Sequence, residues 1–370
     1  MNIYLFNILA VLVGALFCAT FQKVYIKINN KKCNIALCFF VIIMFCILFF
    51  EMAFRGDFST DIKNYYYIFK SSCGNIVELF QNENLGVSRD ILYQILNTVV
   101  HQFGGEFLHL QIIIALVISF FYVKFVKNNS PTLWLSFLIL FCSGSFYTGF
   151  NVVRQLLVAA LFSYCYKYIE NSQFGKYVIY IILISTMHLS ALFMLPMYFF
   201  FEIQWKKKSA FTVTGIVLLL TISAYLFANN IISVITKFVF TGYSDQTHYG
   251  LTDGVGLLGT LKAIAMSLGI LFNYKRFDMS DSKERMVYNG TVLYLMFAIV
   301  GSKVFIIQRF THFFIPCLMI GYPILLTKIK NKNTKQLMYC LTIGFFIVAG
   351  LNVVIDNNYY FYWDNQSLSW

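Results

Sequence analysis

The sequence predicts an all-α, polytopic integral membrane protein with about 11–12 transmembrane helices. Three observations support this fold class. Of the 370 residues, 59% are apolar and only 12% are Asp, Glu, Lys or Arg, which is roughly half the charged fraction of a soluble domain. A bilayer span requires about 20 apolar residues, so the apolar content suffices for roughly ten or eleven spans. Finally, the apolar residues are concentrated in long runs, and a soluble fold is therefore excluded.

Hydropathy marks the expected membrane segments in order along the chain. Two long polar stretches, 51–106 and 229–257, interrupt them and are not rich enough in Pro, Gly or Ser to be linkers. We therefore expect a single domain over 1–370 with two loops and no internal repeat. The apolar runs are 3–21, 34–50, 107–126, 131–149, 152–168, 177–201, 209–228, 258–273, 287–307, 310–327 and 336–355.

The distribution of Lys and Arg predicts the orientation, because basic residues accumulate on the cytoplasmic side. Lys23, Lys27, Lys31 and Lys32 follow the first run. The N-terminus and both long loops are therefore expected outside. The first run lacks the positive flank and cleavage site of a signal peptide, so we expect it to be retained.

The run 177–201 decides the topology of the second half of the chain. A single crossing would place the basic loops that follow on the external side, whereas a re-entrant or short helical hairpin near 177–203 keeps them inside. In an alternative topology, residues 91–103 cross the membrane and 177–201 passes once. That arrangement leaves more basic residues outside, so it ranks second.

Charge and cysteine content exclude other classes of protein. The net charge of +12 is scattered between apolar runs, which does not suit a nucleic-acid-binding surface. None of the nine cysteines forms a C-x-x-C pair, so neither a zinc site nor a disulfide framework is predicted. We expect no cofactor and no metal.

Ionisable residues at the predicted external ends of the spans are the candidate site residues, because charge at membrane depth is costly and often functional. Snorkelling of long side chains toward the headgroups is the alternative explanation. The guanidinium fork of Arg matches two phosphate oxygens, so a cluster of such cations suits a lipid diphosphate and its departure as a leaving group. The candidate cations are Arg55, Arg89, Arg154, Lys262, Lys303 and Arg309.

Other candidate side chains could act on a sugar. Asp57 and Asp61 are four residues apart and could share one helical turn, acting as a base or binding hydroxyl groups. Tyr65 could stack on a sugar ring. His188 lies in a polar island within an apolar run, where it is either a general base or a histidine that hydrogen-bonds a break in the helix.

Five segments in order carry a family resemblance. They are Arg55 with Ser59-Thr60-Asp61-x-x-x-Tyr65-x-x-x-Phe69, Asp90-Ile91-Leu92-Tyr93-x-x-Leu96, Asn151-Val152-Val153-Arg154-Gln155, His188-Leu189-Ser190-Ala191-Leu192 and Arg309-Phe310-Thr311-His312-Phe313-Phe314. This combination resembles the EpsG-like branch of the Wzy-type polysaccharide polymerases. The chain departs from that pattern at Asp90, where glutamate is expected, and at Ser59, where glycine is expected.

The resemblance implies a glycosyltransferase of the inner membrane whose active site faces outward. It would join oligosaccharide repeat units carried on undecaprenyl pyrophosphate into O-antigen, capsule or exopolysaccharide. By the resemblance, Arg154 and Arg309 would bind the pyrophosphate, and His188 or Asp61 would deprotonate the acceptor hydroxyl. We expect the remaining candidates to bind substrate. A chain-length regulator and a flippase are the implied protein partners.

Two other functions remain as alternatives. A flippase for lipid-linked units would share the basic cavity, but charges midway through several spans and two-fold internal similarity would be expected. A glycosyltransferase that uses polyprenyl-phosphate sugars would use Asp57 and Asp61 as a base or a metal site. Loss of activity on chelation would favour this last function.

Overall fold

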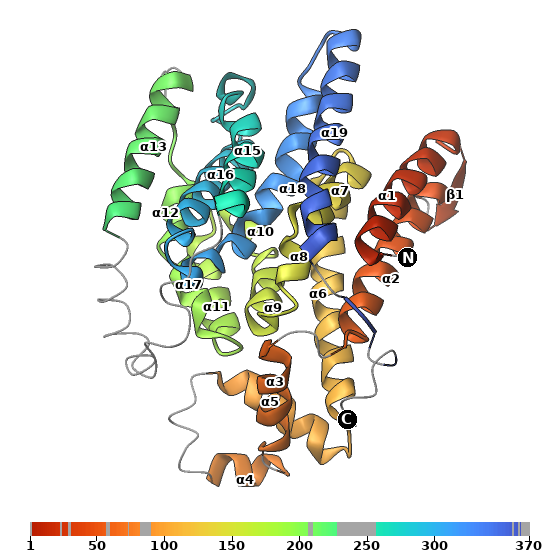
Figure 1. The fold of residues 1–370 in the computed structure, drawn as a ribbon, viewed down its shortest axis with the longest axis vertical. Coiled ribbons are helices and arrows are strands. Elements are labelled where there is room, and N and C mark those ends of the chain that lie inside the picture. The colour runs from red at the N-terminus through yellow and green to blue at the C-terminus, as the bar shows by residue number, and fades with distance from the viewer. Residues whose placement is uncertain are drawn as a thin grey trace.

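The structure, a computed structural model, is a helical bundle with several helices of membrane-spanning character (Figure 1). It describes residues 2–22, 24–28, 31–56, 60–72, 74–81, 90–205, 210–227, 257–356, 359–361 and 363. Within these residues, four helices are long and apolar enough to cross a bilayer: α1 (Ile3–Thr20), α2 (Ile35–Ala53), α6 (Phe107–Asn129) and the Lys332–Leu351 part of α19 (Lys332–Asp356). Shorter apolar helices accompany them, so the predicted polytopic helical fold is confirmed, whereas the number of spans stays a prediction.

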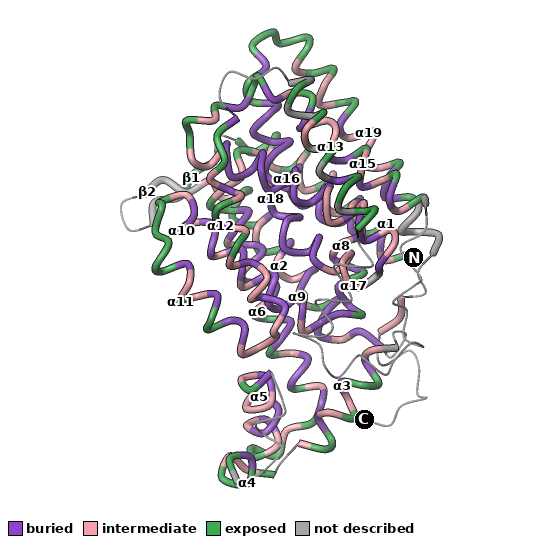
Figure 2. The backbone as a smooth tube through the Cα atoms, turned by 90° about the vertical axis from the view of Figure 1, so that its left-hand side faces the viewer, coloured by how far each residue is buried: buried purple, intermediate pink, exposed green. Residues whose placement is uncertain are grey.

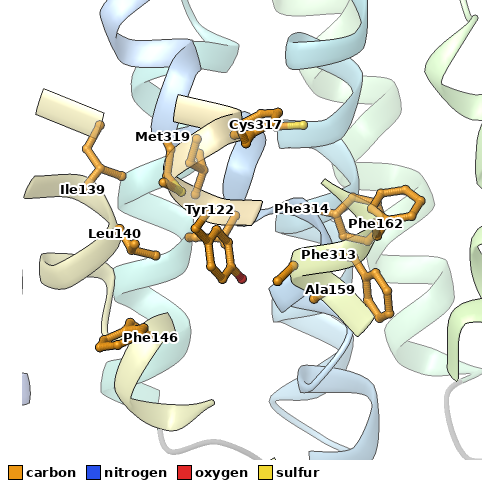
Figure 3. Close-up of a cluster of buried hydrophobic side chains, with 14 of the residues drawn as sticks. Tyr122, Ile139, Leu140, Phe146, Ala159, Phe162, Phe313, Phe314, Cys317 and Met319 are labelled. Carbon is orange, nitrogen blue, oxygen red and sulfur yellow. The ribbon is translucent and has the colours of Figure 1, made fainter. Parts of the chain in front are cut away.

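The centre of the bundle is formed by helices that are buried on all sides. α16 (Ser282–Gly301) and α18 (Thr311–Thr327) run through the buried interior (Figure 2). α7 (Leu133–Ser143) and α9 (Val153–Phe162) pack beside them, and Figure 3 shows Tyr122 of α6 among their side chains. By contrast, α13 (Ala210–Leu226), α15 (Leu257–Leu271) and α19 expose large apolar side chains. Such exposed apolar faces are suited to contact with lipid.

Three runs that hydropathy predicts as single spans are interrupted in the structure. α7 ends at Gly144, whose φ of 78° is the left-handed conformation that glycine adopts without strain. α8 (Ser145–Thr148) follows it. Likewise α9 is followed by α10 (Tyr166–Glu170), and α16 by α17 (Phe305–Gln308). Hydropathy cannot detect these breaks because it averages over a window of about 19 residues, and the segments around each break are apolar overall.

The chain reverses direction between residues 174 and 201, as the charge distribution predicts. α11 (Phe174–Ser185) is followed by the 3-10 helix η2 (Leu189–Met194) and by α12 (Met197–Phe201). The Tyr177 hydroxyl donates to the Met194 carbonyl at 2.5 Å, and the Phe174 and Tyr198 rings lie 4.9 Å apart. The two arms therefore pack against each other, and residues 186–188 form the tip.

Three helices of the first long loop lie together at one end of the bundle, which we call the site end. They are α3 (Thr60–Lys70), α4 (Ile76–Gln81) and α5 (Ile91–Gln102), drawn at the bottom of Figure 1. α5 has 12 residues, too few to span a bilayer. The structure thus disfavours the topology in which this segment crosses the membrane.

A small β-hairpin is an exception to the expected all-α fold. β1 (Tyr25–Ile28) and β2 (Lys31–Asn34) pair antiparallel, with Tyr25 opposite Asn34. The Asn34 side chain accepts a hydrogen bond from the Leu37 amide and caps α2.

The short 3-10 helix η4 (Tyr274–Arg276) lies between α15 and α16 in the chain.

Candidate functional site

Asp90 is the centre of an ionic cluster at the site end. Its Oδ2 accepts hydrogen bonds from Arg154 Nη1 at 2.7 Å and from His188 Nδ1 at 3.1 Å, and its Oδ1 accepts the Leu189 amide at 3.2 Å. Asp90 precedes α5, Arg154 lies in the first turn of α9, and the other two donors lie at the hairpin tip. One carboxylate therefore joins three separate elements.

The hairpin tip is held against α5 by the backbone as well. The Leu92 amide donates to the Thr186 carbonyl at 2.9 Å. His188, just before η2, has an extended backbone conformation, and its side chain is one-quarter exposed. With Nδ1 donating to Asp90, the lone pair of His188 lies on Nε2, the tautomer that a general base requires.

Arg154 is further positioned by two tyrosines. Its guanidinium carbon lies 5.3 Å from the centroid of the Tyr65 ring and 5.4 Å from that of the Tyr93 ring. Such cation–π contacts stabilise a cation without neutralising it. α3 and α5 thus fix the guanidinium between two rings and one carboxylate.

A second ion pair lies beside the first. Arg309 Nη2 is 3.9 Å from Asp61 Oδ2, and both side chains are nearly one-third exposed. Asp61 is in the first turn of α3, and Arg309 directly follows α17. The neighbouring Phe310 ring packs 5.0 Å from Phe193 of η2, which brings the start of α18 to the hairpin.

The two carboxylates differ in their acidity. Burial raises the pKa of Asp61 above its ordinary value, and the charges of Arg309 and Arg154 only partly oppose this. For Asp90, burial acts in the same direction, but the hydrogen bond and charge of His188 together with Arg154 hold its pKa below the ordinary value. Of these two carboxyl groups, Asp90 is therefore the more acidic.

Arg55 extends the cluster toward the C-terminal residues. Its side chain is 2% exposed, donates to the Met52 carbonyl, and makes no ion pair with any described residue. Its charge acts on the hydroxyls of Tyr65 and Tyr93. Its backbone pairs with Phe361, so residue 361 is held beside the end of α2.

An apolar cavity of about 600 Å³ is lined in part by Phe361, the residue whose backbone pairs with Arg55. The first turn of α1, the last turns of α2 and residues 359–361 line it, and Phe6 and Phe50 on its wall are partly exposed. A buried polar group borders it: Asn7 donates to Glu51 Oε2 at 2.9 Å and to the Tyr147 hydroxyl at 2.6 Å. The sequence interpretation assigned Glu51 to the first polar stretch, whereas the structure places it in the last turn of α2.

The structure brings together six of the ten candidate residues: Arg55, Asp61, Tyr65, Arg154, His188 and Arg309. Lys303 instead approaches the Tyr225 carbonyl of α13 at 3.5 Å, and the charge of Lys262 acts on Cys142 of α7. Asp57 and Arg89 lie outside the described residues. The roles of all ten stay predictions.

The main omission of the sequence interpretation is the role of Asp90. It belongs to one of the five resemblance segments, but nothing in the sequence indicated that Arg154 and His188 would share it. Among the residues that the structure describes, no group of three or more His, Cys, Asp or Glu side chains is arranged to hold a metal ion.

The apolar helices and the charge cluster at one end define a polytopic helical membrane protein. The chain belongs to the EpsG family, whose model matches residues 37–367. This range contains all five segments of the resemblance, and membership indicates an integral membrane protein similar to polysaccharide polymerases. Neither a curated protein nor a solved structure matches the chain.

Proposed function

We propose that this protein polymerises oligosaccharide repeat units carried on undecaprenyl pyrophosphate, by glycosyl transfer at the external face of the cell membrane. One observation carries the proposal: Asp90 binds both Arg154, a group suited to a diphosphate, and His188, a group suited to proton transfer. A group that can bind the diphosphate and a group that can accept a proton, both of which glycosyl transfer requires, thus lie in one cluster.

The proposed reaction makes one bond and breaks one bond. The acceptor hydroxyl oxygen attacks the anomeric carbon of the donor sugar, and the bond between that carbon and the pyrophosphate oxygen breaks. His188 Nε2 takes the hydroxyl proton, while Asp90 holds the ring and stabilises its charged form. The electron pair stays on the departing pyrophosphate, whose charge Arg154 and Arg309 stabilise.

The balance of charge supports an anionic substrate. Arg154 and Arg309 pair with Asp90 and Asp61, while Arg55 makes no ion pair with any described residue. The apolar cavity lined by α1, α2 and residues 359–361 suits part of a lipid carrier, because its walls are mostly apolar. A lipid with a diphosphate headgroup combines these properties.

The position of the basic loops supports an external site. β1 and β2, which carry Lys27, Lys31 and Lys32, lie at the end of the bundle away from α3, α4 and α5 (Figure 1). By the positive-inside rule, the end that holds the lysines is cytoplasmic. Lipid-linked units that have already been flipped outward would then meet the ionic cluster.

The experiment that tests the proposal is a gel profile of surface polysaccharide. A strain lacking the gene should lose the long ladder while a single repeat unit still reaches the surface. Complementation with the wild type should restore the ladder, and Arg154→Lys should not, because one ammonium cannot replace the bidentate fork. Arg276→Lys is the matched control, since Arg276 is exposed and, among the described residues, its side chain donates only to Asn273.

Each other outcome points to a different function. Loss of even the single unit would reject polymerisation in favour of flipping. An unchanged ladder in the deletion strain would also contradict the proposal. To identify the base, His188→Gln and Asp61→Asn are compared at equal protein level: the proposal requires the larger loss from His188→Gln.

A further inference from the structure

Three lysines line a second cavity, far from the ionic cluster. The cavity has a volume of about 260 Å³ and lies between the ends of α6 and α10 and the start of α16. Lys124, Lys167 and Lys283 each come from a different one of these helices. Arg154 is in the first turn of α9, whereas Lys167 lies beyond the end of that helix, in α10.

Two of these ammonium groups are close to one another. Lys124 Nζ lies 5.1 Å from the centroid of the Tyr164 ring, and Lys167 Nζ lies 3.5 Å from the same centroid. The nitrogens are therefore less than about 9 Å apart, a distance at which like charges repel unless solvent or a counter-ion screens them.

No carboxylate neutralises the lysines. Among the described residues, none of the three forms an ion pair, and Glu170 is the only acidic side chain on the cavity wall. The Tyr164 ring attracts both ammonium groups without cancelling their charge. An anion in the cavity would remove the repulsion and connect the three helices.

We propose that this cavity binds the phosphate headgroup of an anionic phospholipid from the surrounding bilayer. The cavity lies beside a lipid-facing surface: Lys124 Nζ is 5.2 Å from the ring of Phe120, which is 47% exposed. Basic pockets between transmembrane helices are established sites for such headgroups. The exposed Asn128 amide on the cavity wall adds a hydrogen-bond donor for a phosphate oxygen.

The test measures lipid binding to the purified full-length protein in a neutral detergent, by thermal unfolding and by native mass spectrometry. Phosphatidylglycerol should bind and raise the unfolding temperature, whereas phosphatidylcholine with the same acyl chains should not. The Lys124→Gln/Lys167→Gln variant should bind phosphatidylglycerol about 25-fold more weakly, at roughly fivefold for each lysine.

Two further variants separate the site from general effects of charge. Lys176→Gln/Lys332→Gln removes two exposed lysines and should bind phosphatidylglycerol like the wild type. Lys124→Arg/Lys167→Arg keeps both charges and should retain binding, which excludes misfolding as the cause of the loss.

Three results would overturn the proposal. The first is equal binding of phosphatidylglycerol and phosphatidylcholine. The second is a loss of phosphatidylglycerol affinity in Lys176→Gln/Lys332→Gln as large as that in Lys124→Gln/Lys167→Gln. The third is a rise in unfolding temperature with inorganic phosphate as large as that with phosphatidylglycerol. The last result would assign the cavity to a soluble phosphate compound. None of these measurements depends on polymerase activity.

Discussion

The two ends of the molecule use charged residues in different ways. At the site end, the Asp90 carboxylate accepts from both Arg154 and His188, and these two side chains are about one-quarter exposed. The second ion pair there, between Arg309 and Asp61, has a distance of 3.9 Å. At the opposite end, Arg285 is 5% exposed and donates to Glu202 at 2.8 Å and to the Met279 carbonyl at 3.1 Å. Lys328 pairs closely with Glu284 in the same region.

Neutral polar groups at the opposite end are also paired within the protein. The Trp205 indole donates to Asn289 Oδ1 at 2.7 Å, and the Asn289 amide donates to the Phe201 and Ile203 carbonyls. These bonds connect the end of the hairpin to α16. At the opposite end each paired cation has its own carboxylate, whereas at the site end Arg154 and His188 share the carboxylate of Asp90. We expect this sharing to leave the site-end cations able to bind an anionic ligand.

Asp90→Asn should have the largest effect on activity. The neutral amide no longer fixes the His188 tautomer or balances Arg154, so we expect polymer formation per molecule to fall by about 10²-fold or more. Glu202→Gln, the matched change at the opposite end, should leave activity per molecule near the wild-type value. The measurement is polymer yield normalised to membrane protein.

Asp90→Glu sharpens this prediction, because it keeps the charge and restores the residue expected from the family resemblance. The Asp90→Glu variant should therefore have more activity than Asp90→Asn and less than the wild type. If Asp90→Asn and Glu202→Gln reduced activity equally, the distinction between the two ends would be wrong.

Arg285→Leu should have the largest effect on stability. It leaves Glu202 without its partner, and we expect a loss of about 2–3 kcal/mol in the free energy of unfolding. The Arg285→Leu/Glu202→Leu double variant should recover part of the loss because no uncompensated charge remains. Denaturation of the purified protein measures this effect, and activity per folded molecule should be unchanged.

The low pKa of Asp90 predicts an acid-sensitive hairpin. A carboxylate whose pKa is depressed in the folded state contributes stability above its unfolded pKa, near 3.8, and loses it as the pH falls through the folded value. The stability difference between wild type and Asp90→Asn should therefore be constant at neutral pH and shrink below about pH 4. A difference that is independent of pH down to pH 2 would contradict this assignment.

Asp61 should show a smaller effect of opposite sign. Because burial raises its pKa in the folded state, stability should decrease as the pH rises from 3.8 through that higher value. Arg309→Gln removes the nearest opposing charge and should raise the pKa further, whereas Lys303→Gln should not. Carboxyl NMR titration of the three proteins measures this directly.

The sequence by itself determined the membrane fold and selected residues that the structure brings together in the ionic cluster. Composition and hydropathy fixed the class of protein, because burial in lipid demands apolar segments irrespective of their packing. The bias of basic residues predicted the hairpin, and ionisable groups at the ends of spans selected Asp61, Arg154, His188 and Arg309. Each of these inferences depends on the order of residues along the chain and on no contact between distant segments.

Only the tertiary structure decided how these groups meet. Asp90 contacts Arg154 across 64 positions and His188 across 98, and no local pattern specifies a contact at such separations. The break at Gly144 and the exclusion of Lys262 and Lys303 from the cluster likewise follow from the packing of helices against one another. Hydropathy identifies which segments enter the membrane, but the contacts between distant segments determine which charges become partners.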